Sequence, residues 1–242
     1  MKTQFRFRTP HSALRARRAF TLIELLVVLS VIGLMAALTF PAIAAVKKSM
    51  LKARVKAELL ALQTTIENFK DKMGYYPPDN KMGNPEAYAL NQLYYELHGV
   101  TNIATANAPI YETLDGSAKI AAADLGAVFG PNVTGFMNCA KPRSGDEMSG
   151  GHAFVRALKV GQYRSITTGG KSCTIMGSGV DGPFVYTSDE QNAKINPWRY
   201  NVSNPHYNKT FDLWMDVMVG DKTNRICNWS DRPLVVSQPY QY

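Results

Sequence analysis

The chain has 242 residues and a formal net charge of +8, from 27 Lys and Arg against 19 Asp and Glu. Six of the basic residues and none of the acidic ones lie in residues 1–19, so the other 21 basic and 19 acidic residues nearly balance. The positive charge is therefore mostly that of an N-terminal segment, which excludes a basic nucleic-acid-binding domain as its explanation. None of the three cysteines belongs to a CxxC or Cys/His pattern, which excludes an ordinary zinc motif.

An uncharged apolar run follows the basic segment. No charged residue occurs from Leu25 to Val46, and as a helix this run would be about 33 Å long, enough to cross a bilayer. We predict one membrane span over residues 20–46. The denser basic cluster lies upstream of the span, so the N-terminus is expected on the cytoplasmic side and everything after Lys48 outside.

Glu24 is the one carboxylate near the start of this run. A charged side chain there costs up to about 2.5–3.5 kcal/mol and needs a partner. If the chain is cut between Ala19 and Phe20, a new α-amine appears four residues before Glu24 and can pair with it, within one chain or from a neighbour. The alternative is an uncut anchor with Glu24 at the depth of the lipid headgroups.

Residues 17–28, Arg-Arg-Ala-Phe-Thr-Leu-Ile-Glu-Leu-Leu-Val-Val, resemble the prepilin processing motif of type IV pilins and of type II secretion pseudopilins. The resemblance implies that a prepilin peptidase removes residues 1–19, that Phe20 is then methylated, and that Glu24 guides assembly. It also implies that Gly33 and Pro41 soften the helix. Ala19 departs from the family, which usually has Gly before the cut.

Beyond Lys47 the run becomes amphipathic. Apolar residues recur every three or four positions from Leu51 to Met73, with Lys, Arg and Glu between them. We predict one helix over residues 20–73, ended by Gly74, whose second half packs against an outer domain of residues 74–242.

The outer domain reads as α+β. Capping residues and apolar spacing predict helices over 84–99 and 117–129, and alternation predicts strands near 154–158, 184–186, 198–202 and 210–219. Segments 138–151 and 166–182 are rich in Gly, Ser and charge and are expected to be loops. The predicted fold is pilin-like, with the long helix packed on a small antiparallel sheet.

The C-terminal region gathers oxygen-bearing side chains within sixteen residues, namely Asp216, Asp221, Asn224, Asn228 and Asp231. Calcium prefers oxygen ligands and tolerates irregular loops. The resemblance to major pseudopilins, which carry a calcium site in the corresponding loop, implies such a site at Asp216, Asp221, Asn224 and Asp231. The residues themselves favour an ordinary polar turn, because no Asp-x-Asp-x-Asp-Gly array is present and Lys222 and Arg225 lie among the oxygen-bearing side chains.

The cysteines and the remaining polar residues predict no catalysis. Cys139, Cys173 and Cys227 all lie in the outer part, where an oxidising compartment would give one disulfide of unknown pairing and one remaining thiol. The histidines stand apart from one another, and the chain has no nucleophile elbow, phosphate-binding glycine loop or His-Glu-x-x-His motif. We therefore expect a protein that is not an enzyme.

Together these patterns predict a structural subunit of a pilus or pseudopilus fibre in a bacterial inner membrane. Its outer domain would lie in the periplasm or on the cell surface. The expected partners are copies of itself, other pilin-like subunits, the prepilin peptidase and an inner-membrane assembly platform. Asn196-Pro197-Trp198 with Phe211-Asp212-Leu213-Trp214 loosely resembles major pseudopilins, which favours type II secretion. The alternative is a secreted or anchored binding domain, for carbohydrate for example, that uses exposed aromatics: Tyr75, Tyr76, Trp198, Trp214 and Trp229.

Overall fold

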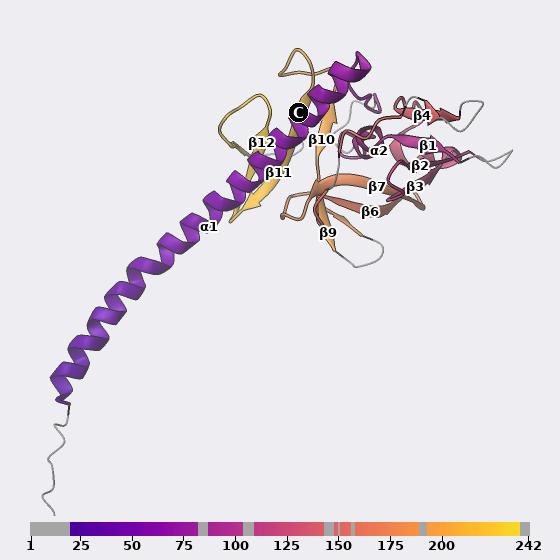
Figure 1. The fold of residues 1–242 in the computed structure, drawn as a ribbon. Helices are drawn as coiled ribbons and strands as arrows, with labels where there is room; N and C mark the ends of the chain where they lie inside the picture. Colours follow the sequence, from indigo (N-terminus) through magenta and orange to yellow (C-terminus); the bar gives the residue numbers. More distant parts are fainter. Residues whose placement is uncertain are drawn as a thin grey trace, which may run out of the picture. The chain divides into compact units, whose positions relative to one another are not determined.

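The computed structural model describes residues 20–81, 87–103, 109–142, 148–149, 151–155, 158–188 and 193–237. The chain divides into two compact units, Met1–Val46 (unit 1) and Lys47–Tyr242 (unit 2). The boundary between them falls inside helix α1, which runs from Leu22 to Met73 (Figure 1).

Helix α1 confirms the long predicted helix almost to the residue. It ends at Met73, and Gly74 follows with a φ of +84°. That left-handed conformation is one that glycine adopts without steric cost. The Gly74 N–H still donates to the Lys70 carbonyl at 2.7 Å, so the chain leaves the helix with its last turn closed.

In the part of the chain that the structure describes, the strands of unit 2 form three sheets. The first has the order β3-β2-β1-β4-β5 and is antiparallel except where β1 lies parallel to β4. Its strands are β1 (Val100–Asn102), β2 (Ile110–Thr113), β3 (Lys119–Ala121), β4 (Cys139–Pro142) and β5 (Met148–Ser149).

The other two sheets are antiparallel. The second has the order β6-β7-β9-β8 and contains β6 (Tyr163–Thr168), β7 (Lys171–Ser178), β8 (Tyr186–Thr187) and β9 (Lys194–Pro197). The third has the order β10-β11-β12-β13 and contains β10 (Arg199–Asn201), β11 (Asp212–Val219), β12 (Lys222–Cys227) and β13 (Leu234–Val236). Short helices complete the unit: α2 (Leu93–His98), the 3-10 turn η1 (Ala122–Asp124) and α3 (Leu125–Phe129).

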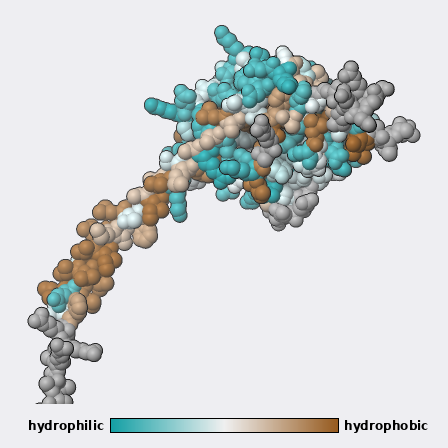
Figure 2. All heavy atoms as spheres, viewed as in Figure 1, coloured by the Kyte–Doolittle hydropathy of each residue, from teal (hydrophilic) through white to brown (hydrophobic). Residues whose placement is uncertain are grey.

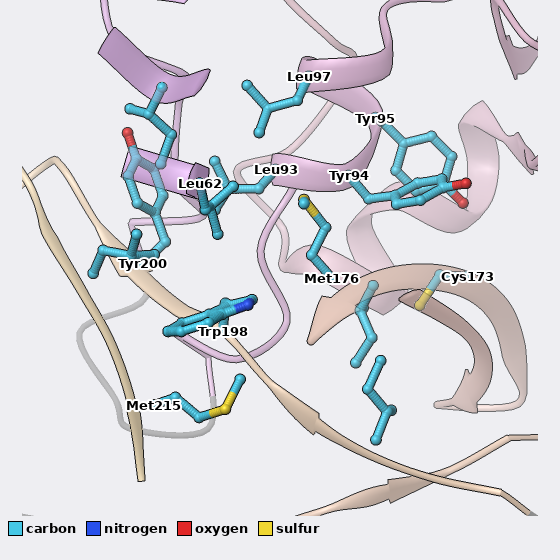
Figure 3. Close-up of a cluster of buried hydrophobic side chains, with 14 of the residues drawn as sticks. Leu62, Leu93, Tyr94, Tyr95, Leu97, Cys173, Met176, Trp198, Tyr200 and Met215 are labelled. Atoms are coloured by element: carbon cyan, nitrogen blue, oxygen red, sulfur yellow. The ribbon is translucent and has the colours of Figure 1, made fainter. Parts of the chain in front are cut away.

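The core of unit 2 forms around the apolar stripe of α1. Figure 3 shows Leu62 of α1 among side chains from α2, from β7 and from the third sheet. The predicted stripe is confirmed, because its central residues are all buried in one hydrophobic cluster: Val55, Leu59, Leu62, Ile66 and Phe69. The outer domain therefore covers the second half of α1, as its spacing predicts.

Strand β11 is buried on both faces. Leu213, Met215 and Val217 point to the main core, which confirms the alternation read from the sequence. The other face carries Trp214 and Asp216, also buried. One face of the predicted strand thus covers the helix stripe, and the second face has a buried cluster of its own.

Several predicted elements are wrong or shorter. The predicted loop 166–182 contains β7, whose Ser and Thr residues lie in a buried strand, and the predicted loop 138–151 contains β4 and β5. The predicted helix 117–129 is helical only in α3 and η1 and begins with β3. In the described residues around 154–158 no strand is present. Residues 84 and 85, expected to start a helix, lie outside the described residues, and the helix there is confined to α2.

Candidate functional site at the start of the long helix

The first turn of α1 is closed by a reciprocal cap between Thr21 and Glu24. Glu24 Oε2 accepts the Thr21 N–H at 2.9 Å and the Thr21 hydroxyl at 2.8 Å, and the Glu24 N–H donates to Thr21 Oγ1 at 3.3 Å. This is a capping box, in which a Thr and a Glu three residues later satisfy the first unpaired N–H groups of a helix. The spacing Thr-x-x-Glu was present in the sequence, so this partner of Glu24 could have been found there.

The cap occupies only half of the Glu24 carboxylate. Both bonds that the carboxylate accepts from Thr21 fall on Oε2, and within the described residues Oε1 accepts no hydrogen bond. A carboxylate retains acceptor capacity on its second oxygen. Glu24 can therefore hold the helix end and still accept a cationic or N–H donor from outside the chain.

The apolar side chains that follow have no partner within the chain. Apart from Ala36, every described side chain of residues 20–46 is exposed, and Phe20 itself is 81% exposed. Figure 2 shows this part of α1 as a nearly continuous hydrophobic surface. Among the described residues, α1 is the one helix long and apolar enough to cross a membrane. Such a surface needs a bilayer or another protein to cover it.

The two residues expected to soften the helix lie within α1. A Cβ added at Gly33 would meet nothing within 4 Å, so no contact inside this chain requires glycine there. The helix also continues through Pro41. The softening role stays a prediction. Ala19 and residues 1–18 lie outside the described residues.

The residues predicted to bind calcium do not form a fitting site. Asp216 is fully buried and makes a bidentate ion pair with Arg225, at 2.8 Å from Oδ1 to Nε and 3.0 Å from Oδ2 to Nη2. Asn228 is occupied by backbone groups, whereas Asp221 and Asp231 are exposed. In the described residues no three His, Cys, Asp or Glu side chains are grouped to hold a metal. A guanidinium already neutralises the central carboxylate, so we derive no role for calcium.

The cysteines lie in three different sheets. Cys139 is in β4, Cys173 in β7 and Cys227 in β12, and among the described residues no disulfide joins them. The expected disulfide is therefore not formed in this structure. Burial raises the pKa of the Cys227 thiol, which keeps it in its less reactive protonated form.

The aromatic residues of the carbohydrate-binding alternative are largely internal. Trp198 and Trp214 are buried, and the Tyr76 hydroxyl donates to Glu67 Oε2 at 3.0 Å. Trp229 is half-buried and stacks on Tyr207, with 4.5 Å between the ring centroids. These side chains build the core and its edge, and Tyr75 is the exposed member of the predicted set.

Two buried carboxylates organise the connection between β10 and β11. Asp79 accepts the N–H groups of Val202 and Ser203, each at 2.8 Å. Asp212 accepts three further backbone N–H groups of the same connection, at 2.7–3.1 Å: those of His206, Tyr207 and Asn208. Val202 and Ser203 lie more than 120 residues from Asp79, so no local sequence signal could have identified this contact.

Glu96 of α2 is another buried carboxylate. Its oxygens accept the N–H groups of Met137, at 2.8 Å, and Asn138, at 2.9 Å. Burial raises the pKa of Glu96 to about 7, although the two N–H donors act in the opposite direction. Glu96 thus ties α2 to the segment that leads into β4, and the sequence analysis did not single it out.

The comparisons with known proteins bear on the N-terminal segment. Residues 14–40 match the family described as the prokaryotic N-terminal methylation motif. No curated protein and no solved structure matches the chain. The matched segment contains Phe20, the Thr21–Glu24 cap and Gly33, and it ends one residue before Pro41. The chain thus carries the prokaryotic N-terminal methylation motif at the start of a long apolar helix, a combination consistent with a type IV pilin-like subunit that a prepilin peptidase processes.

Proposed function

We propose that the protein is a non-enzymatic structural subunit of a pseudopilus fibre that serves type II secretion. In this proposal residues 1–19 are removed before Phe20, which is then methylated. The mature chain stays in the inner membrane as a single-pass protein, with its outer domain in the periplasm, until an assembly platform extracts it. Copies of the chain and other pilin-like subunits then form the fibre.

The observation that carries the proposal is the uncovered apolar surface of residues 20–46 directly behind the methylation motif. A bilayer covers that surface before assembly. Extraction would expose it to water at a cost of about 25 cal/mol for each Å². Packing the same surface against neighbouring helices removes that cost, so a bundle of such helices at the centre of a fibre is a stable destination.

Glu24 would set the register of that bundle. Its Oε2 is held by Thr21, and Oε1 keeps its acceptor capacity for a partner outside the chain. The α-amine of Phe20 on a neighbouring subunit is a cation of the right kind. A subunit placed out of register would leave a charge unpaired in an apolar surrounding, which is strongly unfavourable.

Variants of Glu24 and Thr21 distinguish the role of the capping box from the role of the negative charge of Glu24. Glu24→Gln keeps the capping box, because Gln also serves at that position, but removes the charge. Thr21→Val removes the cap and keeps the charge. We expect all variants to be cut and methylated at Phe20 by N-terminal mass, while Glu24→Gln and Glu24→Ala give little fibre and Thr21→Val retains most of it.

Normal fibre yield from Glu24→Gln would contradict the register role of the charge. A mature N-terminus near Ala45 in the wild-type chain would contradict the fibre proposal as a whole, because it would mean an ordinary signal peptide. The type II assignment rests on the loose pattern around Trp198 and Trp214. Its test is deletion of the gene, which should abolish export of folded enzymes and leave surface motility unchanged.

A further inference from the structure

Four lysines gather where unit 2 begins. Lys47 and Lys48 follow the predicted span directly in the sequence, and Lys52 lies one helical turn after Lys48. Lys222 is the first residue of β12, directly after the turn that joins β11 and β12. We call these four residues the basic collar. Lys47, Lys48 and Lys222 are exposed and Lys52 is half-buried, so their ammonium groups are available to a partner.

The hairpin turn lies beside the helix in unit 2. A Cβ added at Gly220 would be 3.1 Å from Lys48 Nζ, which places the β11–β12 turn against the first turn of the helix in this unit (Figure 1). Val219 pairs with Lys222 across that turn. Residues more than 170 positions apart in the sequence thus form one basic surface, which the sequence alone does not reveal.

The collar lysines have no acidic partners in the described structure. The ion pairs there involve Arg54, His98, Lys119, Lys171 and Arg225, and none includes a collar residue. The next lysine along the same helix face, Lys56, differs, because its Nζ donates to the carbonyls of Cys227 and Ser230. The acid nearest in sequence to Lys222 is Asp221, so the collar keeps an excess of about three positive charges.

This excess of positive charge is confined to the basic collar. Without residues 1–19 the chain has 21 basic and 19 acidic residues, an excess of two. Four lysines less Asp221 already give an excess of three, so the remainder of the chain is close to neutral. General basicity therefore does not explain the collar.

The distance of the collar lysines from the membrane surface indicates which partner they can reach. Lys52 lies five residues beyond Lys47, about 7.5 Å along a helix, and the Debye length at physiological salt is about 8 Å. The whole collar therefore falls within the electrostatic reach of the membrane surface that the predicted span crosses. Lys70 and Lys72, in the last turn of the same helix, are about 33 Å or more beyond Lys47 and fall outside it.

We propose that the basic collar binds the headgroups of anionic phospholipids and so holds unit 2 at the membrane surface while the subunit waits for assembly. The proposal rests on the membrane anchoring in the proposed function. Each lysine near an anionic surface strengthens such an association about fivefold. Extraction into a fibre would then have to break these contacts together with the burial of residues 20–46.

The test uses the full mature chain reconstituted in vesicles of phosphatidylcholine with spin-labelled phosphatidylglycerol or spin-labelled phosphatidylcholine as the probe. The measured quantity is the relative association constant of the two lipids with the protein. We expect a severalfold preference for phosphatidylglycerol over phosphatidylcholine. The preference should fall towards one in Lys48→Gln/Lys52→Gln. It should also fall towards one for the wild-type chain in 1 M NaCl, where the Debye length is about 3 Å. The matched variant Lys70→Gln/Lys72→Gln should keep the wild-type preference.

Each other outcome has a distinct meaning. Motionally restricted lipid without any preference for phosphatidylglycerol would overturn the collar and leave the anchored subunit intact. No restricted lipid at all would instead overturn the membrane span and with it the proposed function. Self-association of the reconstituted chain that Lys48→Gln/Lys52→Gln abolishes, without any preference for phosphatidylglycerol, would assign the lysines to acidic groups of a second copy, which also overturns the lipid site.

Discussion

Both halves of helix α1 carry large apolar residues, but the two halves bury them differently. Before Lys47 almost every side chain is exposed, whereas after it a stripe from Val55 to Phe69 is fully covered by the chain's own strands and short helices. The comparison teaches that one helix can be stabilised by two different surroundings. The second half is stabilised by unit 2, and the first half depends on a bilayer or on neighbouring subunits.

The largest effect on the free energy of unfolding is expected from the buried ion pair between Asp216 and Arg225, both of which belong to unit 2. Asp216→Ala leaves the Arg225 guanidinium buried without its carboxylate, which should cost about 3–5 kcal/mol of the free energy of unfolding. The measurement is denaturant unfolding of the mature chain in detergent, followed by tryptophan fluorescence, since all three tryptophans lie in unit 2.

The matched control is the double variant Asp216→Leu/Arg225→Met, which removes both charges and should recover much of the loss. A loss below about 1 kcal/mol for Asp216→Ala would mean that the pair is not buried in solution. Glu24→Gln provides the contrast from unit 1 and should leave the unfolding of unit 2 unchanged.

The next largest effect on the free energy of unfolding is expected from the apolar stripe of α1. Leu59→Ala removes a fully buried side chain from the core and should cost about 2–5 kcal/mol. Leu60→Ala, next to it but 52% exposed, and Leu29→Ala, in unit 1, should each change the unfolding of unit 2 by less than about 0.5 kcal/mol. Equal losses at positions 59 and 60 would contradict the burial of the stripe.

The buried carboxylate of Glu96 makes unit 2 sensitive to pH. Because burial raises its pKa from 4.5 to about 7, the folded state keeps a proton between these pH values that the unfolded state has lost. The stability from this group is therefore full below pH 4.5 and falls as pH rises towards 7, by about 3 kcal/mol in total.

Glu96→Gln should flatten this slope, because the amide does not titrate, although it leaves one of the two N–H donors without an acceptor and lowers stability at acid pH. The check is the free energy of unfolding from pH 4 to pH 8 for both proteins. The same slope in both would assign the pH dependence to another group.

The smallest effect on the free energy of unfolding is expected at Lys56 and Lys52 of helix α1. Lys56→Met keeps the apolar stem but removes two charged hydrogen bonds, to Cys227 O at 3.1 Å and to Ser230 O at 2.8 Å, and should cost about 2 kcal/mol of unfolding free energy. Lys52→Met, one turn earlier and without such bonds, should change it by less than about 0.5 kcal/mol. Reversed results would mean that Lys52 supports the fold and not a membrane contact.

Much of the first quarter of the chain could be predicted because its signals are local. The uncharged apolar run, the end of α1 at Met73 and the apolar stripe follow from spacing along one helix, and the methylation motif is a contiguous segment. The cap between Thr21 and Glu24 is equally local, because the two residues are three positions apart.

Unit 2 was predicted less well because its strands are defined by what covers them. Strand β7 and strand β12 contain Ser, Thr, Asn and Arg that read as loop or turn, but burial and cross-strand partners make them strands. Arg225 is the clearest case, since its charge argues for the surface until Asp216, directly opposite in the sheet, neutralises it.

The sequence by itself determined which segment carries the methylation motif, which segment needs an apolar surrounding and which face of α1 must be covered, because each depends on residues that are close together in the chain. The tertiary structure alone decided what covers that face, that Asp216 serves an ion pair and not a metal, and that Lys222 joins Lys47, Lys48 and Lys52. Those results depend on contacts between residues far apart in the chain, and no local sequence pattern predicts which distant residue makes each contact.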